Sequence, residues 1–169
     1  MKSLVTIVNT FEMDIVSINV FDRPVQSLID SAGYKYVNEN IKCSKILIHK
    51  PGIRPVAIWH PNRIISTEGA NKAIKLMTTV IDGETYKGRP GTIEDLVSYE
   101  IEFFEELTGI NLVALSEKVL RELSDSIECV AYRYYSDSSK HRLHLRELKG
   151  DWESVFRFLV VFEKFSESE

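Results

Sequence analysis

The stretch Thr92–Gly109 constrains the fold of this chain most, because it carries a full set of helix signals. Thr92 and Asp95 form a capping-box-like pair at its start, and Gly109 stands where a left-handed residue often ends a helix. Between them, apolar residues recur at three- and four-residue spacing: Ile93, Leu96, Val97, Ile101, Phe104 and Leu107. This spacing predicts an amphipathic helix that packs its apolar face on the core.

The acidic residues of this stretch have two interpretations. Glu102, Glu105 and Glu106 lie on the side opposite the apolar face, where they are either solvated or presented to a basic partner. Glu100 is different, because it falls inside the apolar stripe. A carboxylate in that position must be paired, protonated or led out to water, or else serve as a functional acid.

Length and charge limit the class of protein. The chain has 169 residues, which is enough for one ordinary domain or two small lobes with an apolar core. Its formal charge of −4 argues against a general polyanion binder. The first residues read as a strand rather than a signal peptide, and no apolar run reaches the roughly 18 residues of a membrane span. With only two cysteines, the sequence predicts a cytoplasmic protein without membrane contact.

The pattern along the chain predicts an α+β fold in two lobes. Residues 1–81 read as an N-terminal ββαββα lobe that opens with a hairpin of residues 4–11 and 15–21. Residues 82–91 hold three glycines and a proline and read as a linker. Residues 92–169 read as a C-terminal ααβββ lobe, in which helices at 92–108 and 112–124 pack on a three-stranded antiparallel sheet of residues 128–135, 141–148 and 154–165. One continuous domain is the alternative.

Catalytic and metal-binding motifs are missing from the sequence. The glycine-rich segment lacks the Lys-Ser/Thr of a phosphate-binding loop, and no pair of histidines has metal-ligand spacing on a helix. If Pro51-Gly52 forms a tight turn, His60 falls opposite Cys43, but this pair has no third, orienting group. We therefore expect no metal and no cofactor, and a dispersed site that uses His49 or His60 stays an alternative.

A basic and aromatic segment near the C-terminus is the candidate binding site. Arg142, His144 and Arg146 share one face of their predicted strand, opposite Leu143 and Leu145. The preceding predicted strand adds Tyr132, Arg133 and Tyr134. Such a surface is either a solvated face, a protein contact or a platform for single-stranded nucleic acid.

These patterns favour a non-enzymatic binding or regulatory protein, inhibitor- or adaptor-like, that acts on another protein. The predicted residues are the hairpin set above and Glu102, Glu105 and Glu106, whose opposite charge also suggests a homo-oligomer in which the helix of one copy meets the hairpin of another. Two alternatives remain: a hydrolase or nuclease with a dispersed His/carboxylate site, and a single-stranded nucleic-acid binder.

Overall fold

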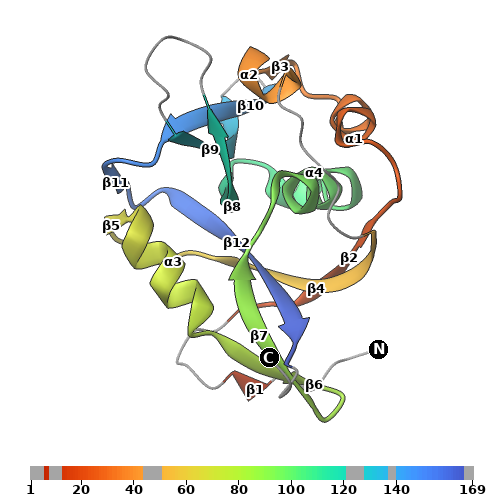
Figure 1. Cartoon of the computed structure of the whole chain (residues 1–169), viewed down its shortest axis with the longest axis vertical. Helices are drawn as coiled ribbons and strands as arrows, with labels where there is room; N and C mark the ends of the chain where they lie inside the picture. The colour runs from red at the N-terminus through yellow and green to blue at the C-terminus, as the bar shows by residue number, and fades with distance from the viewer. Residues whose placement is uncertain (1–5, 8–12, 44–50, 121–127, 137–139, 166–169) are drawn as a thin grey trace.

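The computed structural model describes residues 6–7, 13–43, 51–120, 128–136 and 140–165 (Figure 1). Most strands join one large mixed sheet, and β5 pairs with β11 in a separate ribbon. The strands are β1 (Thr6–Ile7), β2 (Val16–Val20), β3 (Tyr36–Val37), β4 (Gly52–Trp59), β5 (Ile65–Ser66), β6 (Thr78–Ile81), β7 (Glu84–Pro90), β8 (Asn111–Leu120), β9 (Glu128–Ser136), β10 (Lys140–Glu147), β11 (Asp151–Trp152) and β12 (Phe156–Lys164). The helices are α1 (Val25–Ala32), α2 (Glu39–Cys43), α3 (Thr67–Lys75) and α4 (Ile93–Glu102), followed by a 3-10 turn, η1 (Glu105–Leu107).

The central strand is β12, which pairs with three others. Phe158 pairs with both β4 and β8, and Val160 pairs with both β4 and β7. Since a strand has two edges, β4 occupies one edge of β12 while β7 and β8 share the other. From β12, one branch of the sheet runs through β7, β6 and β1, and another runs through β8, β9, β10 and β3.

Helices cover both faces of this sheet. Leu159 and Val161 of β12 enter an apolar cluster with α1 and α4, whereas Phe158, Val160 and Phe162 enter a second cluster with α3. Alternate residues of a strand point to opposite faces, so the two clusters mark the two sides of the sheet. The strand β12 is therefore covered on both faces.

The predicted helix after Thr92 is present but shorter. Thr92 Oγ1 accepts the Asp95 amide at 3.2 Å and Asp95 Oδ2 accepts the Thr92 amide at 3.0 Å, so the capping box is formed. The helix ends at Glu102, and η1 and Gly109, with φ 76°, continue the segment.

The acidic side of α4 is largely inside the protein. Every residue from Ile93 to Glu100 is buried, because α1, β2 and β8 all pack on this helix. Asp95 is fully buried and pairs with Arg54 of β4 and Arg89 of β7, each at 3.0 Å. Only the far end of the acidic side, at Glu102, reaches solvent.

Two further helices follow their sequence signals. Gly33 ends α1 with φ 72°, and Ser66 caps α3 by accepting the Gly69 amide at 3.0 Å. Helix α3 ends at Lys75, and Thr78–Ile81 form β6.

The expected linker is a strand of the sheet. Asp82 and Gly83, with φ of 50° and 81°, make a tight turn between β6 and β7. A Cβ on Gly88 would lie 2.6 Å from Ile74 O, and a Cβ on Gly91 would lie 2.7 Å from the Leu159 side chain. These two glycines allow close packing of α3 on β7 and of the β7–α4 connection on β12.

The predicted α+β fold of two lobes is wrong, because one mixed sheet takes strands from both of its halves. Residues 112–120, predicted as helix, form most of β8. The last strand, β12, does not extend the β9–β10 pair but pairs in parallel with β8. The predicted opening hairpin is also wrong, since β1 pairs with β6 and β2 pairs with β4.

Candidate functional site

The strands β9 and β10 form the antiparallel hairpin that the sequence predicts. Tyr134 pairs with Arg142 and Tyr132 pairs with His144, so these four side chains share one face of the sheet. Tyr36 of the edge strand β3 joins them, because it pairs with Arg142 from the other side. We call the surface formed by Tyr36, Tyr132, Tyr134, Arg142, His144 and Arg146 the hairpin face.

Aromatic rings pack around His144 on the hairpin face. The His144 ring centroid lies 5.0 Å from that of Tyr36, 5.8 Å from that of Tyr132 and 6.1 Å from that of Tyr134. Tyr36 and Tyr134 stay 41% and 40% exposed, which is high for residues so closely packed. The outer rings are therefore held in place while still offering their surfaces to a ligand.

The charge of His144 depends on this packing. Burial, and then the nearby Arg142 guanidinium, lower the pKa of His144 below its ordinary value. The imidazole is consequently neutral at pH 7, and the exposed Arg142 carries positive charge on the outer part of the hairpin face.

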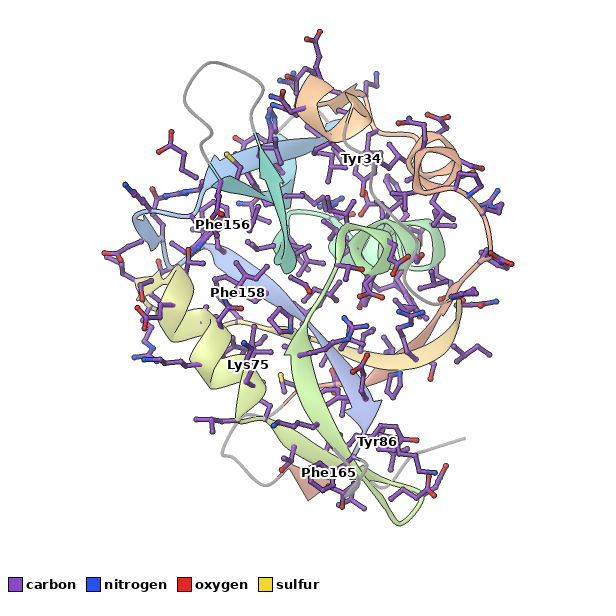
Figure 2. The ribbon with its side chains drawn as sticks, viewed as in Figure 1. Tyr34, Lys75, Tyr86, Phe156, Phe158 and Phe165 are labelled. Carbon is purple, nitrogen blue, oxygen red and sulfur yellow. The ribbon has the colours of Figure 1, made fainter. Side chains whose placement is uncertain are left out.

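Arg146 is committed to packing within the molecule. Its guanidinium lies 4.8 Å from the Trp152 ring centroid and 5.2 Å from that of Phe156, and its Nη2 donates to Asp151 O at 2.9 Å. Trp152 and Phe156 belong to the apolar cluster under α3, and Figure 2 labels Phe156. Arg146 thus marks the border where the α3-covered part of this face ends and the hairpin face begins.

Arg133 does not belong to the hairpin face, because it points to the opposite side of β9. Its side chain is fully buried, and its Nε donates to both carboxylate oxygens of Glu100, at 3.0 and 2.8 Å. Its Nη1 donates to Leu107 O at 2.6 Å and to Ile110 O at 2.7 Å. The prediction that Arg133 is a surface binding residue is wrong, and Arg133 is instead the partner that Glu100 requires.

His141 and Tyr34 complete a buried polar cluster around Glu100. His141 Nε2 lies 3.5 Å from Glu100 Oε1 and 3.1 Å from Ala32 O. The Tyr34 hydroxyl is buried without a hydrogen-bond partner among the described residues, and burial followed by the Glu100 charge raises its pKa well above the ordinary value. Burial likewise raises the pKa of Glu100, although Arg133 and His141 act to lower it.

The role of this cluster is structural: it joins the β9–β10 hairpin to the rest of the protein. Arg133 and Glu100 have side-chain exposures of 0%, and that of His141 is 9%. A reacting molecule has no room to touch them while the core is closed. The cluster joins α4 and the loop after it to the inner side of β9 and β10.

The three predicted acidic residues lie at the exposed end of α4 and in η1. Glu102, Glu105 and Glu106 are all exposed. Glu102 Oε2 accepts the Asn19 amide at 3.3 Å, which ties it to β2. Burial, followed by the charges of Glu106 and Asp14, raises the pKa of Tyr99.

The histidine and cysteine candidates do not form a described site. His60 is exposed just after β4, and its Nε2 lies 2.8 Å from Ser154 O. Cys43 ends α2 instead of lying on a strand beside β4, which pairs with β2 and β12. His49 lies outside the described residues. Within the described part of the chain, no group of three or more His, Cys, Asp or Glu side chains is arranged to hold a metal ion.

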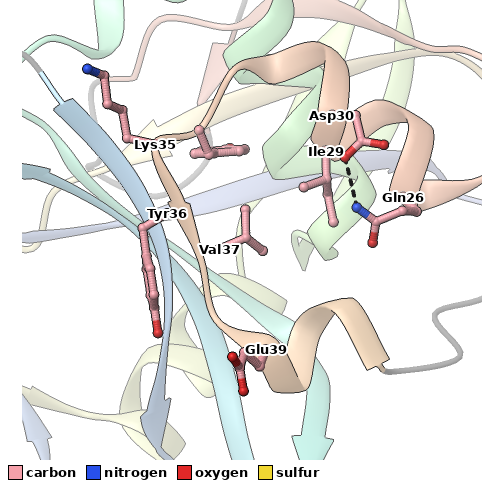
Figure 3. Close-up of a pocket in the computed structure, with 8 residues that line it drawn as sticks. Gln26, Ile29, Asp30, Lys35, Tyr36, Val37 and Glu39 are labelled. Atoms are coloured by element: carbon pink, nitrogen blue, oxygen red, sulfur yellow. Dashed lines mark hydrogen bonds between the residues drawn. The ribbon is translucent and has the colours of Figure 1, made fainter.

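A groove that sequence reasoning missed borders the hairpin face. It has a volume of about 330 Å³ and lies between α1 and β3 (Figure 3). Its lining residues are Gln26, Ile29, Asp30, Tyr34, Lys35, Tyr36, Val37 and Glu39. Residues 34–41 gave no clear helix or strand pattern, and two tyrosines in that short segment were the signal that could have indicated it.

The comparisons with known proteins add no name to this surface. A scan against protein-family models, a search of curated proteins and a search of solved structures each found no match. In the described residues, no helix is both long enough and apolar enough to cross a membrane.

Proposed function

We infer that this protein is a non-enzymatic binding protein, inhibitor- or adaptor-like, that contacts another protein through the hairpin face. The observation that supports this most is the pair of exposed tyrosines, Tyr36 and Tyr134, held on either side of His144 next to Arg142. Tyrosine and arginine are the residues that protein interfaces favour, and a tyrosine already held by its neighbours loses little freedom on binding.

The hairpin face lies on the same side of the sheet as α3, in the part that α3 does not cover. Phe158 and Trp152 of the same side are buried with α3, whereas Tyr36 and Tyr134 remain at the surface beyond Arg146. A partner that covered Tyr36 and Tyr134 would continue the layer that α3 begins. Loss of one such tyrosine from an interface costs about 2 kcal/mol, which weakens binding about thirtyfold.

Affinity capture with matched variants tests this function. Three proteins are immobilised: the wild type, the double variant Tyr134→Ala/Arg142→Ala and the control Phe165→Ala. Proteins that each one retains from a cell lysate are identified by mass spectrometry. Phe165 is 54% exposed and lies at the opposite end of the molecule from Tyr34, so it controls for loss of an exposed ring (Figure 2).

We expect one or more proteins to be retained by the wild type and by Phe165→Ala but not by the double variant. Retention of the same proteins by all three samples would contradict the function. A fluorescein-labelled oligo-dT is measured in parallel, and tight, salt-dependent binding that requires Tyr134 would instead support the nucleic-acid alternative.

A further inference from the structure

The hairpin face and the groove beside it share one side chain, Tyr36. Its ring contacts His144 at 5.0 Å between centroids on the hairpin side, and the same residue lines the groove between α1 and β3 (Figure 3). Because Tyr36 belongs to both, the two surfaces are continuous. A chain that crosses the edge strand β3 would pass from one to the other.

The two ends of this surface carry opposite charge. Arg142 is exposed on the hairpin side, next to a His144 that stays neutral. On the groove side, Asp30 and Glu39 are exposed, and Lys35 extends away from both of them (Figure 3). The Gln26 Nε2 atom donates to Asp30 Oδ1 at 2.9 Å and so holds that carboxylate in place.

We propose that this continuous surface binds an extended peptide segment of a partner protein, with an acidic side chain at Arg142, an apolar or aromatic middle over Tyr36, and a basic side chain at Asp30 and Glu39. This inference rests on the proposed protein-binding function and names the kind of partner segment. The charge pattern decides which end of the segment lies at Arg142, because the reverse placement brings like charges together at both ends.

The groove offers apolar as well as charged surface to the segment. Ile29 and Val37 supply the apolar part of the groove wall.

A nucleic-acid strand fits this surface less well. Asp30 and Glu39 both line the groove, so a strand that entered it would lie within the Debye length of about 8 Å at physiological salt from their carboxylates. The phosphates of a strand whose bases stack on Tyr36 would therefore be repelled by Asp30 and Glu39 without full screening. A peptide with charges of both signs meets no such repulsion.

A selection from phage-displayed random dodecapeptides, followed by fluorescence-anisotropy titration of the enriched peptides, tests the proposal. We expect enriched peptides to carry Asp or Glu and Lys or Arg on either side of an aromatic or apolar residue. Tyr36→Ala should weaken binding about tenfold or more. Arg142→Glu and Asp30→Lys/Glu39→Lys should each weaken it about threefold to tenfold, and a peptide with the facing charge reversed should recover the loss. The control Phe165→Ala should bind as the wild type does, and circular dichroism should show every variant folded.

The possible results separate this inference from the function on which it rests. If Tyr134→Ala and Arg142→Glu weaken a selected peptide but Tyr36→Ala and Asp30→Lys/Glu39→Lys do not, only the β9–β10 part of the hairpin face binds protein, and Tyr36 and the groove have no part in it. If no peptide is enriched, or if none of these variants changes the affinity, the peptide site is refuted. Tighter, Tyr36-dependent binding of oligo-dT than of any peptide would overturn both proposals.

Discussion

The buried pair of Glu100 and Arg133 offers the sharpest test of how this protein is held together. Both side chains are fully buried, and Arg133 also satisfies the carbonyl oxygens of Leu107 and Ile110. Replacement of Arg133 by Met leaves the Glu100 carboxylate without its guanidinium and removes the donor from both carbonyls. Breaking a buried ion pair from one side costs about 3–5 kcal/mol, so Arg133→Met should lower the free energy of unfolding by about that amount.

The replacement of both partners should cost less than the two single changes together. Glu100→Leu alone leaves a buried guanidinium without its carboxylate and should cost about 3 kcal/mol. In the double variant no unpaired charge remains, so the coupling between the two changes should amount to about 2 kcal/mol or more. The carbonyl oxygens of Leu107 and Ile110 still lose their donor, so the free energy of unfolding of the double variant stays below that of the wild type.

Urea unfolding of the wild type, the two single variants and the double variant measures this cycle. The free energies are compared by linear extrapolation, provided that the slope with urea is the same for all four proteins. Exposed Arg63, replaced by Met, serves as a control for the loss of a guanidinium and should change the stability by less than about 0.5 kcal/mol. Losses from the two single variants that add within about 0.5 kcal/mol in the double variant would refute the reasoning.

Three further predictions concern pH, the start of α4 and the fold of β7. Burial raises the pKa of Glu100 above its ordinary 4.5, so the protonated carboxyl favours the folded state. Its contribution to the free energy of unfolding is fully present below pH 4.5 and is lost as the pH rises through the folded-state pKa. Urea unfolding at several pH values should therefore show that the wild type loses more stability over this range than Glu100→Leu does. Thr92→Ala should cost about 1–2 kcal/mol in urea unfolding, more than Ser66→Ala, because the Thr92 cap is buried and shared with Asp95; equal costs would contradict this. Gly88→Ala should lower stability by about 1–3 kcal/mol because its Cβ would lie 2.6 Å from Ile74 O, and an unchanged urea midpoint would disprove the close packing.

The hairpin face makes its own prediction about proton binding. His144 should titrate below its ordinary pKa because it is partly buried beside Arg142. The exposed Arg142 side chain lowers the pKa of His144 less than burial does. Arg142→Ala should therefore raise this pKa without restoring the ordinary value. NMR titration of the imidazole Cε1–H signals measures both; a His144 pKa at or above the ordinary value in the wild type would contradict the packing around it.

Local signals in the sequence predicted the helices that depend on local contacts. The caps of α3 and α4 are made within three residues of the chain, and Gly33 ends α1 by its own backbone conformation. Strand pairing depends on residues far apart in the sequence, so the neighbours of β12 could not be predicted in the same way. The parallel contact between β8 and β12 is the clearest case.

The mistaken helix at residues 112–124 has a physical cause. Leu112 and Ala114 of β8 are buried in the cluster under α1 and α4, while Val113 and Leu115 are buried in the cluster under α3. A strand that is apolar on both faces shows no alternation, and its leucines then fit a helical spacing equally well. The prediction of a linker at residues 82–91 was wrong for a different reason. Gly88 lies there because it permits close packing inside the sheet, not because the chain forms a loop.

The candidate site was predicted in part. Strand alternation correctly placed Arg142 and His144 together, and the register of β9 and β10 adds Tyr132 and Tyr134 to their face. The groove beside Tyr36 was missed, because β3 is only two residues long and gives no periodic pattern. Short edge strands are defined by the strand they join, which the sequence alone does not name.

Arg133 and Glu100 show that two anomalies in one sequence can explain each other. On a strand, Arg133 has the opposite parity from Tyr132 and Tyr134, so alternation already turns it toward the core. Glu100 interrupts the apolar stripe of α4 and needs a cation there. Their pairing fixes β9 against α4, and with it the orientation of the tyrosines on the other side of the strand. A variant that breaks this pair without unfolding the protein should therefore also weaken binding at the hairpin face, although neither residue touches the surface.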